Sequence, residues 1–190
     1  MMIPIGRMSS LLRIRGVTPR RFGANEKGVS AVEFALILPM MAMLYLGSVE
    51  VGDGYSIKRK VTHVTSSMAD LVTQSKSISN ADMTNILAIA KAMMTPYNTT
   101  NLKLKITGVT IDSNGKATVT WSDALHDTAR TKGSTVTLPA DVNQKSSFVV
   151  MAEGHYSYKP AIGYVLTGTF DLQDTFYLSP RLSDTVARTS

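Results

Sequence analysis

Apolar residues are distributed unevenly along the chain and are densest in residues 28–54. Glu33 is followed by sixteen residues, 34–49, without a single charge, and Glu33 is the only charge in residues 29–49. A helix of that length rises about 30 Å, which is the thickness of the hydrocarbon core of a bilayer. The pattern therefore predicts a membrane-spanning helix over residues 29–54.

Beyond residue 54 the apolar positions become periodic. Spacings of four and three residues form one apolar face of a helix, so the helix is expected to continue. Gly52 and Gly54 are interpreted as a hinge between the two parts. The face is expected to pack against the domain that follows, with contact to neighbouring subunits as the alternative. It comprises Ile57, Val61, Val64, Met68 and Leu71.

A polar break at residues 75–80 precedes a second predicted helix. Ser79 or Asn80 can cap its first turn by accepting a backbone N–H, and Asp82 suits the positive end of the helix dipole. Pro96 is expected to end it. The expected apolar face consists of Ile86, Leu87, Ile89, Ala90, Met93 and Met94.

The second half of the chain shows the alternation that is typical of strands. A predicted hairpin joins residues 102–107 to residues 118–121 through a turn that ends at Gly115. Residues 147–158 and 168–178 predict two further strands. Helices followed by strands predict an α+β fold, in which a long N-terminal transmembrane helix with an amphipathic continuation precedes a second helix and a small antiparallel β-sheet.

Two polar segments are predicted to lack regular strands. Residues 123–146 are interpreted as a long excursion with one short helix near residues 139–144. The tail, residues 179–190, is expected to be loose. The organisation predicted from these patterns is a basic leader at residues 1–28, the transmembrane helix at residues 29–54 and a periplasmic α+β domain at residues 55–190.

The net positive charge of the chain lies almost entirely in the leader. Residues 1–28 hold six basic side chains and one acid, a net charge of +5, whereas the remaining residues carry fourteen basic and thirteen acidic groups. A basic flank before a spanning helix is retained in the cytoplasm, so we expect a cytoplasmic N-terminus, a single span and the remaining chain outside. The near-neutral remainder argues against nucleic acid as a partner.

No constellation of catalytic or metal-binding residues is recognisable. The chain has no cysteine, which excludes disulfides and thiolate chemistry. His63, His126 and His155 are isolated from one another in the sequence, and we expect structural or solvated roles for them. We therefore expect no catalytic site, no metal and no cofactor, and no enzyme activity.

One short motif does carry information. Residues 27–34 read KGVSAVEF, which resembles the processing site of type IV pilin-like proteins. In that class a membrane peptidase cuts after a glycine, and a glutamate stands fifth in the mature chain. The cut here would fall between Gly28 and Val29, and Glu33 is the fifth residue from Val29. The apolar run and the glycine and acidic residues that follow are similar to the TadE/TadG-like family of tight-adherence pilus assembly proteins.

The resemblance implies a minor pilin-like subunit, or pseudopilin, of a tight-adherence (Flp, type IVb) pilus, with a role in cell adhesion. Phe34 and the sizeable C-terminal domain favour a minor over a major subunit, because the short major subunits typically have tyrosine after the glutamate. The implied partners are the prepilin peptidase, the pilus assembly platform and other pilin-like subunits. The implied location is the bacterial inner membrane, with the domain in the periplasm, or a surface pilus.

The implied role of Glu33 also has a physical basis. A carboxylate in lipid is costly, and the amine exposed at Val29 of a neighbouring subunit could pair with it and set the register between helices. An uncleaved single-pass membrane protein with a periplasmic α+β binding module is the main alternative. A secreted domain with a signal peptide and an organellar targeting sequence at the N-terminus are two others.

Overall fold

The structure is a computed structural model and describes residues 26–189. Most of the basic leader predicted at residues 1–28 therefore lies outside the described residues. The described residues fall into two units, which divide between Leu44 and Tyr45. The long helix α1, Glu26–Thr73, contributes residues to both units and continues through Pro39.

Helix α1 has no break at the two glycines near its middle. Gly52 and Gly54 both lie within continuous helix, so the predicted hinge is wrong. Gly54 lies against the sheet instead, where a β-carbon would come within 3.1 Å of the Tyr158 ring. Its lack of a side chain serves close packing, whereas a β-carbon on Gly52 would meet no atom within 4 Å.

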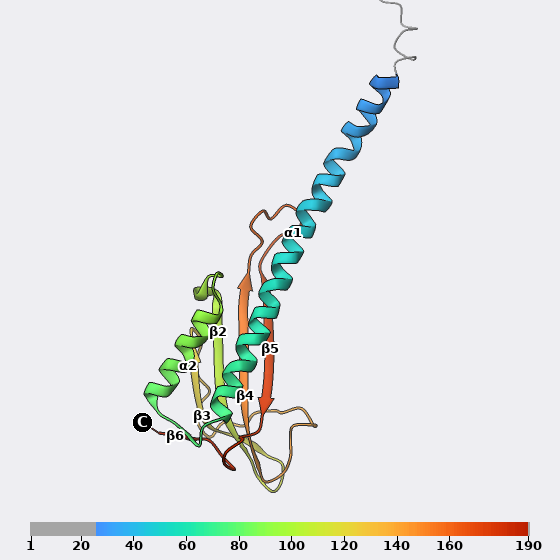
Figure 1. Cartoon of the computed structure of the whole chain (residues 1–190). Helices are drawn as coiled ribbons and strands as arrows, with labels where there is room; N and C mark the ends of the chain where they lie inside the picture. Colours follow the sequence, from blue (N-terminus) through green and yellow to red (C-terminus); the bar gives the residue numbers. More distant parts are fainter. Residues whose placement is uncertain (1–25, 190) are drawn as a thin grey trace, which may run out of the picture. The chain divides into compact units, whose positions relative to one another are not determined.

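The second unit is built on a four-stranded antiparallel sheet with strand order β3-β2-β4-β5 (Figure 1). The α+β class and the antiparallel sheet predicted from the sequence are confirmed. The hairpin β2–β3 turns at residues 112–116, and β4 forms where the third strand was predicted. The strands are β2 (Leu102–Ile111), β3 (Ala117–Leu125), β4 (Ser147–Tyr158) and β5 (Phe170–Leu178).

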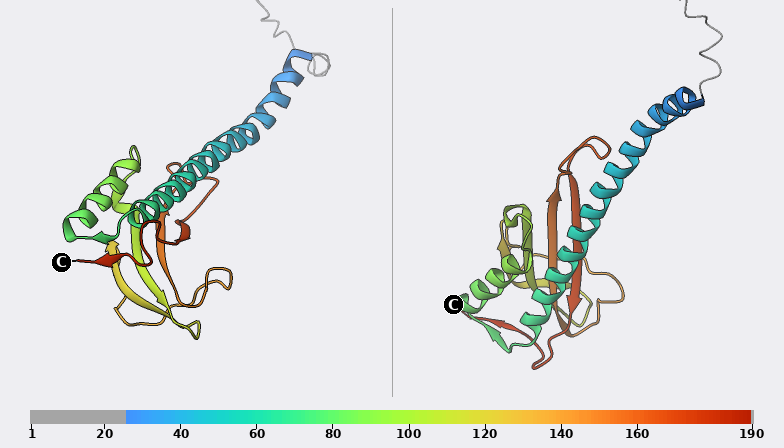
Figure 2. Two further views of the ribbon diagram at one scale, coloured as in Figure 1. Left: turned by 60° about the horizontal axis from the view of Figure 1, so that its bottom comes forward. Right: turned by 45° about the horizontal axis from the view of Figure 1, so that its top comes forward.

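One face of this sheet is covered by two helices, the second half of α1 and α2 (Asn80–Met93) (Figure 2). The apolar face predicted on α1 is buried here, and Val61, Val64 and Met68 are inaccessible to solvent. Alternate residues of β4 meet it, including Tyr156 and Tyr158. The prediction that this face packs within the chain's own domain is therefore confirmed.

Helix α1 lies very close to the sheet at Gly154 on β4. A β-carbon there would stand 2.0 Å from the Thr65 hydroxyl oxygen, which itself donates a hydrogen bond to the Val61 carbonyl. A side chain at this position would have to displace the Thr65 hydroxyl from that hydrogen bond. The contact fixes how deeply α1 packs onto the sheet.

Helix α2 begins and ends as its sequence predicts. Ser79 caps it, with the Asp82 amide donating to the Ser79 hydroxyl and the Asp82 carboxylate accepting from the Ser79 amide. This reciprocal pair is a capping box. Hydrogen bonds from the Ser79 hydroxyl and then from the Ser79 amide to the Asp82 carboxylate lower the pKa of Asp82. One predicted core residue is wrong, because Ile89 is exposed, whereas Met83 is buried in its place.

The opposite face of the sheet is partly covered by residues 126–146. Leu138 packs there against apolar residues of β2 and β4. The short helix predicted near residues 139–144 is absent: the Val142 and Asn143 amides both donate to the Pro139 carbonyl in a turn. Val142 packs beside Leu138 on the sheet. This segment therefore buries single apolar residues from a turn and does not form a helix.

The C-terminal tail is ordered rather than loose, which corrects the prediction for residues 179–190. Strand β6 (Ala187–Arg188) pairs in parallel with β1 (Ser77–Ile78). Val186 is buried, and its carbonyl accepts a 2.7 Å hydrogen bond from the Trp121 indole. The Arg188 guanidinium donates to both carboxylate oxygens of Asp123, at 2.9 and 3.1 Å. These long-range contacts fix a tail whose local composition is polar.

Candidate functional site on helix α1

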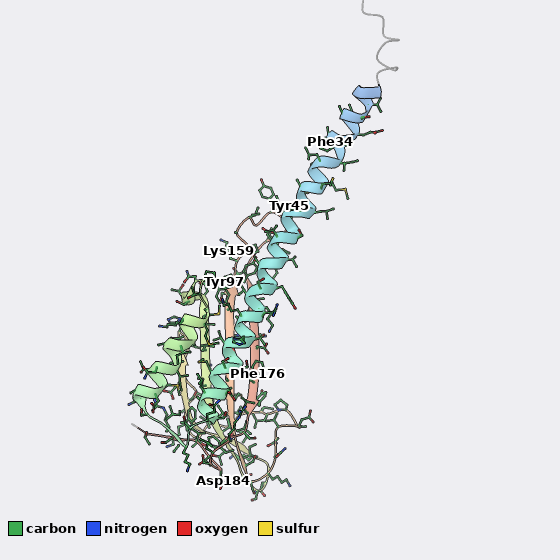
Figure 3. All side chains as sticks on the ribbon, in the orientation of Figure 1. Phe34, Tyr45, Tyr97, Lys159, Phe176 and Asp184 are labelled. Carbon is green, nitrogen blue, oxygen red and sulfur yellow. The ribbon has the colours of Figure 1, made fainter. Side chains whose placement is uncertain are left out.

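The first part of α1 exposes apolar side chains on all of its faces. Every residue from Gly28 to Leu44 is exposed. The described chain has one helix that is long and apolar enough to cross a membrane, Gly28–Thr73, by its length and composition. Figure 3 shows Phe34 projecting outward from this helix, with 60% of its surface exposed. A helix that is apolar on all faces is stable only where protein or lipid, and not water, surrounds it.

The residues of the predicted processing site lie at the start of this segment. Helix α1 begins at Glu26, three residues before the predicted start of the spanning helix, so the bond between Gly28 and Val29 lies within its first turn. Glu33 is about 10 Å along the helix from that start. Val29 and Glu33 are four residues apart and so share one face of the helix.

The Glu33 carboxylate is exposed and makes no hydrogen bond or ion pair with another described residue. The adjacent Phe34 is also exposed. The structure therefore brings Val29 and Glu33 to one helix face and leaves that face free within the described chain. A charged group placed among apolar neighbours without a partner is costly in lipid, so a counter-charge supplied by another chain would be stabilising.

A second glutamate of α1 lies in the opposite situation. Glu50 is 2% exposed. One carboxylate oxygen accepts from the Gly163 amide at 2.5 Å, and the other accepts from the Leu166 amide at 3.0 Å. Both amides belong to the β4–β5 loop, residues 159–169. The Glu50 side chain therefore holds this loop on α1 by two charge-assisted hydrogen bonds.

Sequence reasoning treated Glu50 only as the first charge after the apolar run. A signal was available, because the buried face of α1 continues backwards from Ile57 through Gly54, Glu50 and Gly47 at spacings of three and four. A β-carbon on Gly47 would come within 3.0 Å of Val165 in the loop. Gly54 allows the end of β4 to approach the helix, and Gly47 allows the loop to approach it. Glu50 lies between these two glycines and supplies the polar contact.

Tyr158 completes this contact from the end of β4. Its hydroxyl donates a 2.9 Å hydrogen bond to the Glu50 backbone carbonyl. Burial raises the pKa of Tyr158, and the negative charges of Asp53 and Glu50 add to the increase. The hydroxyl therefore loses its proton, and its ability to donate, only at a higher pH than an ordinary tyrosine.

A polar contact further along α1 joins it to β5. The Asp174 carboxylate accepts from the Thr62 hydroxyl at 2.6 Å and from the Lys58 ammonium at 3.2 Å. Burial of Asp174 acts to raise its pKa, but the hydrogen bonds from Thr62 and Lys58 outweigh it, so the pKa lies below the ordinary value. The contact sits on the flank of the buried face.

The three histidines lie apart from this region and from one another. His63 is exposed on α1. His126 and His155 each make a polar contact through Nδ1, with the Leu102 carbonyl at 3.0 Å and with Asp171 at 3.2 Å. Within residues 26–189 no group of three or more His, Asp or Glu side chains lies close enough together to hold a metal ion.

The fold and the apolar helix together define a candidate single-span protein with an α+β domain. Residues 28–70 match the model of a family described as TadE-like protein, which confirms the resemblance found in the sequence. The match includes Glu33 and Glu50 and ends within α1, before the sheet begins. No curated protein and no solved structure is significantly similar to the chain.

Proposed function

We propose that the protein is a minor pilin-like subunit of a tight-adherence pilus, processed between Gly28 and Val29 and assembled through the first part of α1. The observation that carries the proposal is the exposed apolar segment Gly28–Leu44 with Glu33 at its start, inside the region similar to TadE-like proteins. Its role is structural rather than enzymatic.

The exposed segment accounts for two successive environments. Before assembly its apolar surface suits the inner membrane, where lipid surrounds all faces of a spanning helix. After extraction, the same surface would be buried against the equivalent helices of neighbouring subunits. Both environments are apolar, so the segment needs no change of structure between them.

Glu33 sets the register in this scheme. Cleavage would create an amine at Val29, one helical turn from Glu33 on the same face. Pairing with its own amine or with that of a neighbour would neutralise the carboxylate, and pairing between chains would fix the axial offset of the two helices. Because Glu33 has no other described partner, it is available for this contact.

The basic leader sets the direction of insertion. The net charge of +5 in residues 1–28 would retain that end in the cytoplasm, with the α+β domain in the periplasm. The prepilin peptidase, the assembly platform and the other pilin-like subunits are the partners that this topology requires.

Mass spectrometry of the intact chain tests the proposal. The protein purified from cells that contain the prepilin peptidase is expected to begin at Val29, and the protein from peptidase-deficient cells at Met1. Gly28→Leu is the control variant in which cleavage should be blocked, because it changes only the residue before the cleaved bond. A chain that begins at Met1 in peptidase-containing cells would overturn the proposal.

One observation favours an uncleaved single-pass protein that presents the α+β domain as a periplasmic binding module. The Gly28–Val29 bond is helical, and proteases bind their substrates extended, so cleavage needs the first turn to unwind. Terminal turns fray readily, which makes that cost small. The same mass measurement separates the two candidates.

A further inference from the structure

The β4–β5 loop, residues 159–169, exposes apolar side chains although it lies on the surface. Ile162 and Val165 are exposed, and Tyr164 has 85% of its surface accessible. Residues 160–169 contain no charge, and Lys159 stands at their edge. Surface loops are ordinarily polar, and a contiguous exposed apolar group marks an interaction surface.

The loop is fixed to α1 at the end of the uncharged run. Its backbone amides at Gly163 and Leu166 donate to Glu50, the first charged residue after residues 34–49. Val165 of the loop lies against Gly47, within that run. The apolar surface of the loop is thus continuous with the last uncharged turn of the helix.

This position sets the depth of the loop if α1 spans a bilayer. Twenty-one residues from Val29 to Val49 cross about 30 Å, which places Gly47 and Glu50 at the outer boundary of the hydrocarbon. The loop held on these two residues then lies at the same depth. Tyrosines are enriched at that boundary, because the ring is apolar and the hydroxyl reaches water.

Exposed tyrosines occur on both elements at this end of the second unit. Tyr45 on α1 and Tyr164 in the loop are both largely exposed. Figure 3 shows Tyr45 and Lys159 near this same end of the sheet. Lys159 adds a positive charge that suits anionic lipid headgroups.

The hydrogen bonds to Glu50 also fit this environment. Irregular backbone cannot enter the hydrocarbon without partners for its amides, because water is not available there. Glu50 satisfies two loop amides and is itself neutralised in part by them. The loop can therefore lie in the headgroup region without exposing those groups or the carboxylate.

We infer that the β4–β5 loop is a second membrane contact, which inserts Ile162, Tyr164 and Val165 into the outer headgroup region of the membrane that α1 spans. The inference rests on the proposed function only in that α1 must cross a bilayer. The contact would fix the domain against the membrane surface at two points, the helix and the loop.

Depth measurements with spin labels test this on the full chain. The chain has no cysteine, so single-cysteine variants take one label each. Ala161→Cys and Thr167→Cys report on the loop and keep Ile162, Tyr164 and Val165. Ala42→Cys is the reference within the span, and Ser113→Cys, in the exposed β2–β3 turn, is the reference in water. The proteins are reconstituted in vesicles of phosphatidylethanolamine and phosphatidylglycerol, and collision with oxygen is compared with collision with a water-soluble nickel complex.

The ratio of oxygen collisions to nickel collisions is expected to be higher for both loop labels than for the Ser113→Cys label. The same ratio is expected to be lower for the loop labels than for the Ala42→Cys label. Loop labels as accessible to nickel as the turn label, with a lipid-exposed Ala42→Cys label, would overturn the inference and leave the span intact. A water-exposed Ala42→Cys label would overturn both. Loop labels shielded from both reagents would indicate coverage by protein and would also overturn it.

Glu50→Gln provides the second variant. Glutamine has nearly the same shape but keeps one carbonyl oxygen and turns an N–H₂ group toward a loop amide. Loss of one hydrogen bond to a charged group is expected to raise the detached population of the loop about tenfold or more. Nickel accessibility of the loop labels should rise while the Ala42→Cys label is unchanged. Unchanged loop labels would contradict the role given to Glu50.

Discussion

The two parts of helix α1 differ in apolar content and in what covers it, because the first part is the more apolar and is yet the one left uncovered. From Gly28 to Leu44 every side chain is exposed, whereas from Ile57 to Val72 one face is buried against the sheet. Each part also holds a glutamate, and Glu33 is exposed without a described partner while Glu50 is buried with two. The comparison teaches that apolar composition alone does not define a core. A core forms where periodic apolar residues face a partner surface in the same chain. An apolar segment without such a surface is suited to lipid or to contact with another chain.

The largest expected effect is on the free energy of unfolding, when a methionine is replaced in each part of α1. Met68→Ala removes a fully buried side chain and should lower the free energy of unfolding of the second unit by about 2–5 kcal/mol. Met43→Ala, at an exposed position of the same helix, should leave it unchanged. Denaturation in detergent, followed by fluorescence of Trp121, measures both. Equal losses would show that the first part also packs within the chain.

A pair of glycine substitutions tests the close approach of α1 to the sheet. Gly154→Ala places a methyl group 2.0 Å from the Thr65 hydroxyl and should destabilise the second unit by about 1–3 kcal/mol. Gly52→Ala, on the open side of α1, should stabilise the helix by about 0.5–1 kcal/mol, because alanine loses less backbone entropy. Thermal unfolding gives the sign of each. Destabilisation by Gly52→Ala would restore the hinge that the structure rejects.

The two acids next to the loop should differ in the same way. Glu50→Gln leaves one part-buried loop amide without an acceptor and should cost about 1–3 kcal/mol. Asp53→Asn, one turn further and exposed, is the matched control and should change stability by less than about 0.5 kcal/mol. Urea denaturation of the two variants checks this. Equal effects would mean that the charge rather than the hydrogen bonds matters.

The smallest expected effect is the acid dependence of the contact between α1 and β5. The pKa of Asp174 is lower in the folded than in the unfolded state, so its contribution to stability is present above about pH 4 and is lost as the pH falls through the folded value. Asp174→Asn should remove that part of the acid slope, worth less than about 1 kcal/mol because the pair is partly exposed. An unchanged slope between pH 5 and the acid transition would exclude Asp174 as its source.

The sequence was sufficient wherever structure depends on local periodicity. Strand β4, the capping box of α2 and the buried face of α1 follow from alternation, cap chemistry and helical spacing. Strands β1 and β6 could not be predicted, because each has two residues and their pairing joins positions more than a hundred residues apart. The tail is held by Val186 and Arg188, and only their distant partners reveal it.

The candidate site was predicted in part for the same reason. Gly28, Val29, Glu33 and Phe34 could be proposed as processing and assembly residues because the motif has fixed spacing, and their roles stay a prediction. Glu50 was missed because its partners are the amides of Gly163 and Leu166, which have no side-chain signature. Its place on the buried face of α1 follows from helical spacing, but that spacing does not reveal the loop that covers it.

We propose that two glutamates of α1 have separate roles: Glu33 makes contacts between chains, whereas Glu50 makes contacts within one chain. The most direct test is capture of other pilin-like subunits by the tagged full-length chain from detergent-solubilised membranes, with thermal unfolding measured in parallel. Glu33→Gln should reduce capture at least about tenfold, the equivalent of one lost ionic contact, with unfolding unchanged. Glu50→Gln should lower the unfolding temperature and retain capture. Undiminished capture by Glu33→Gln would contradict the account.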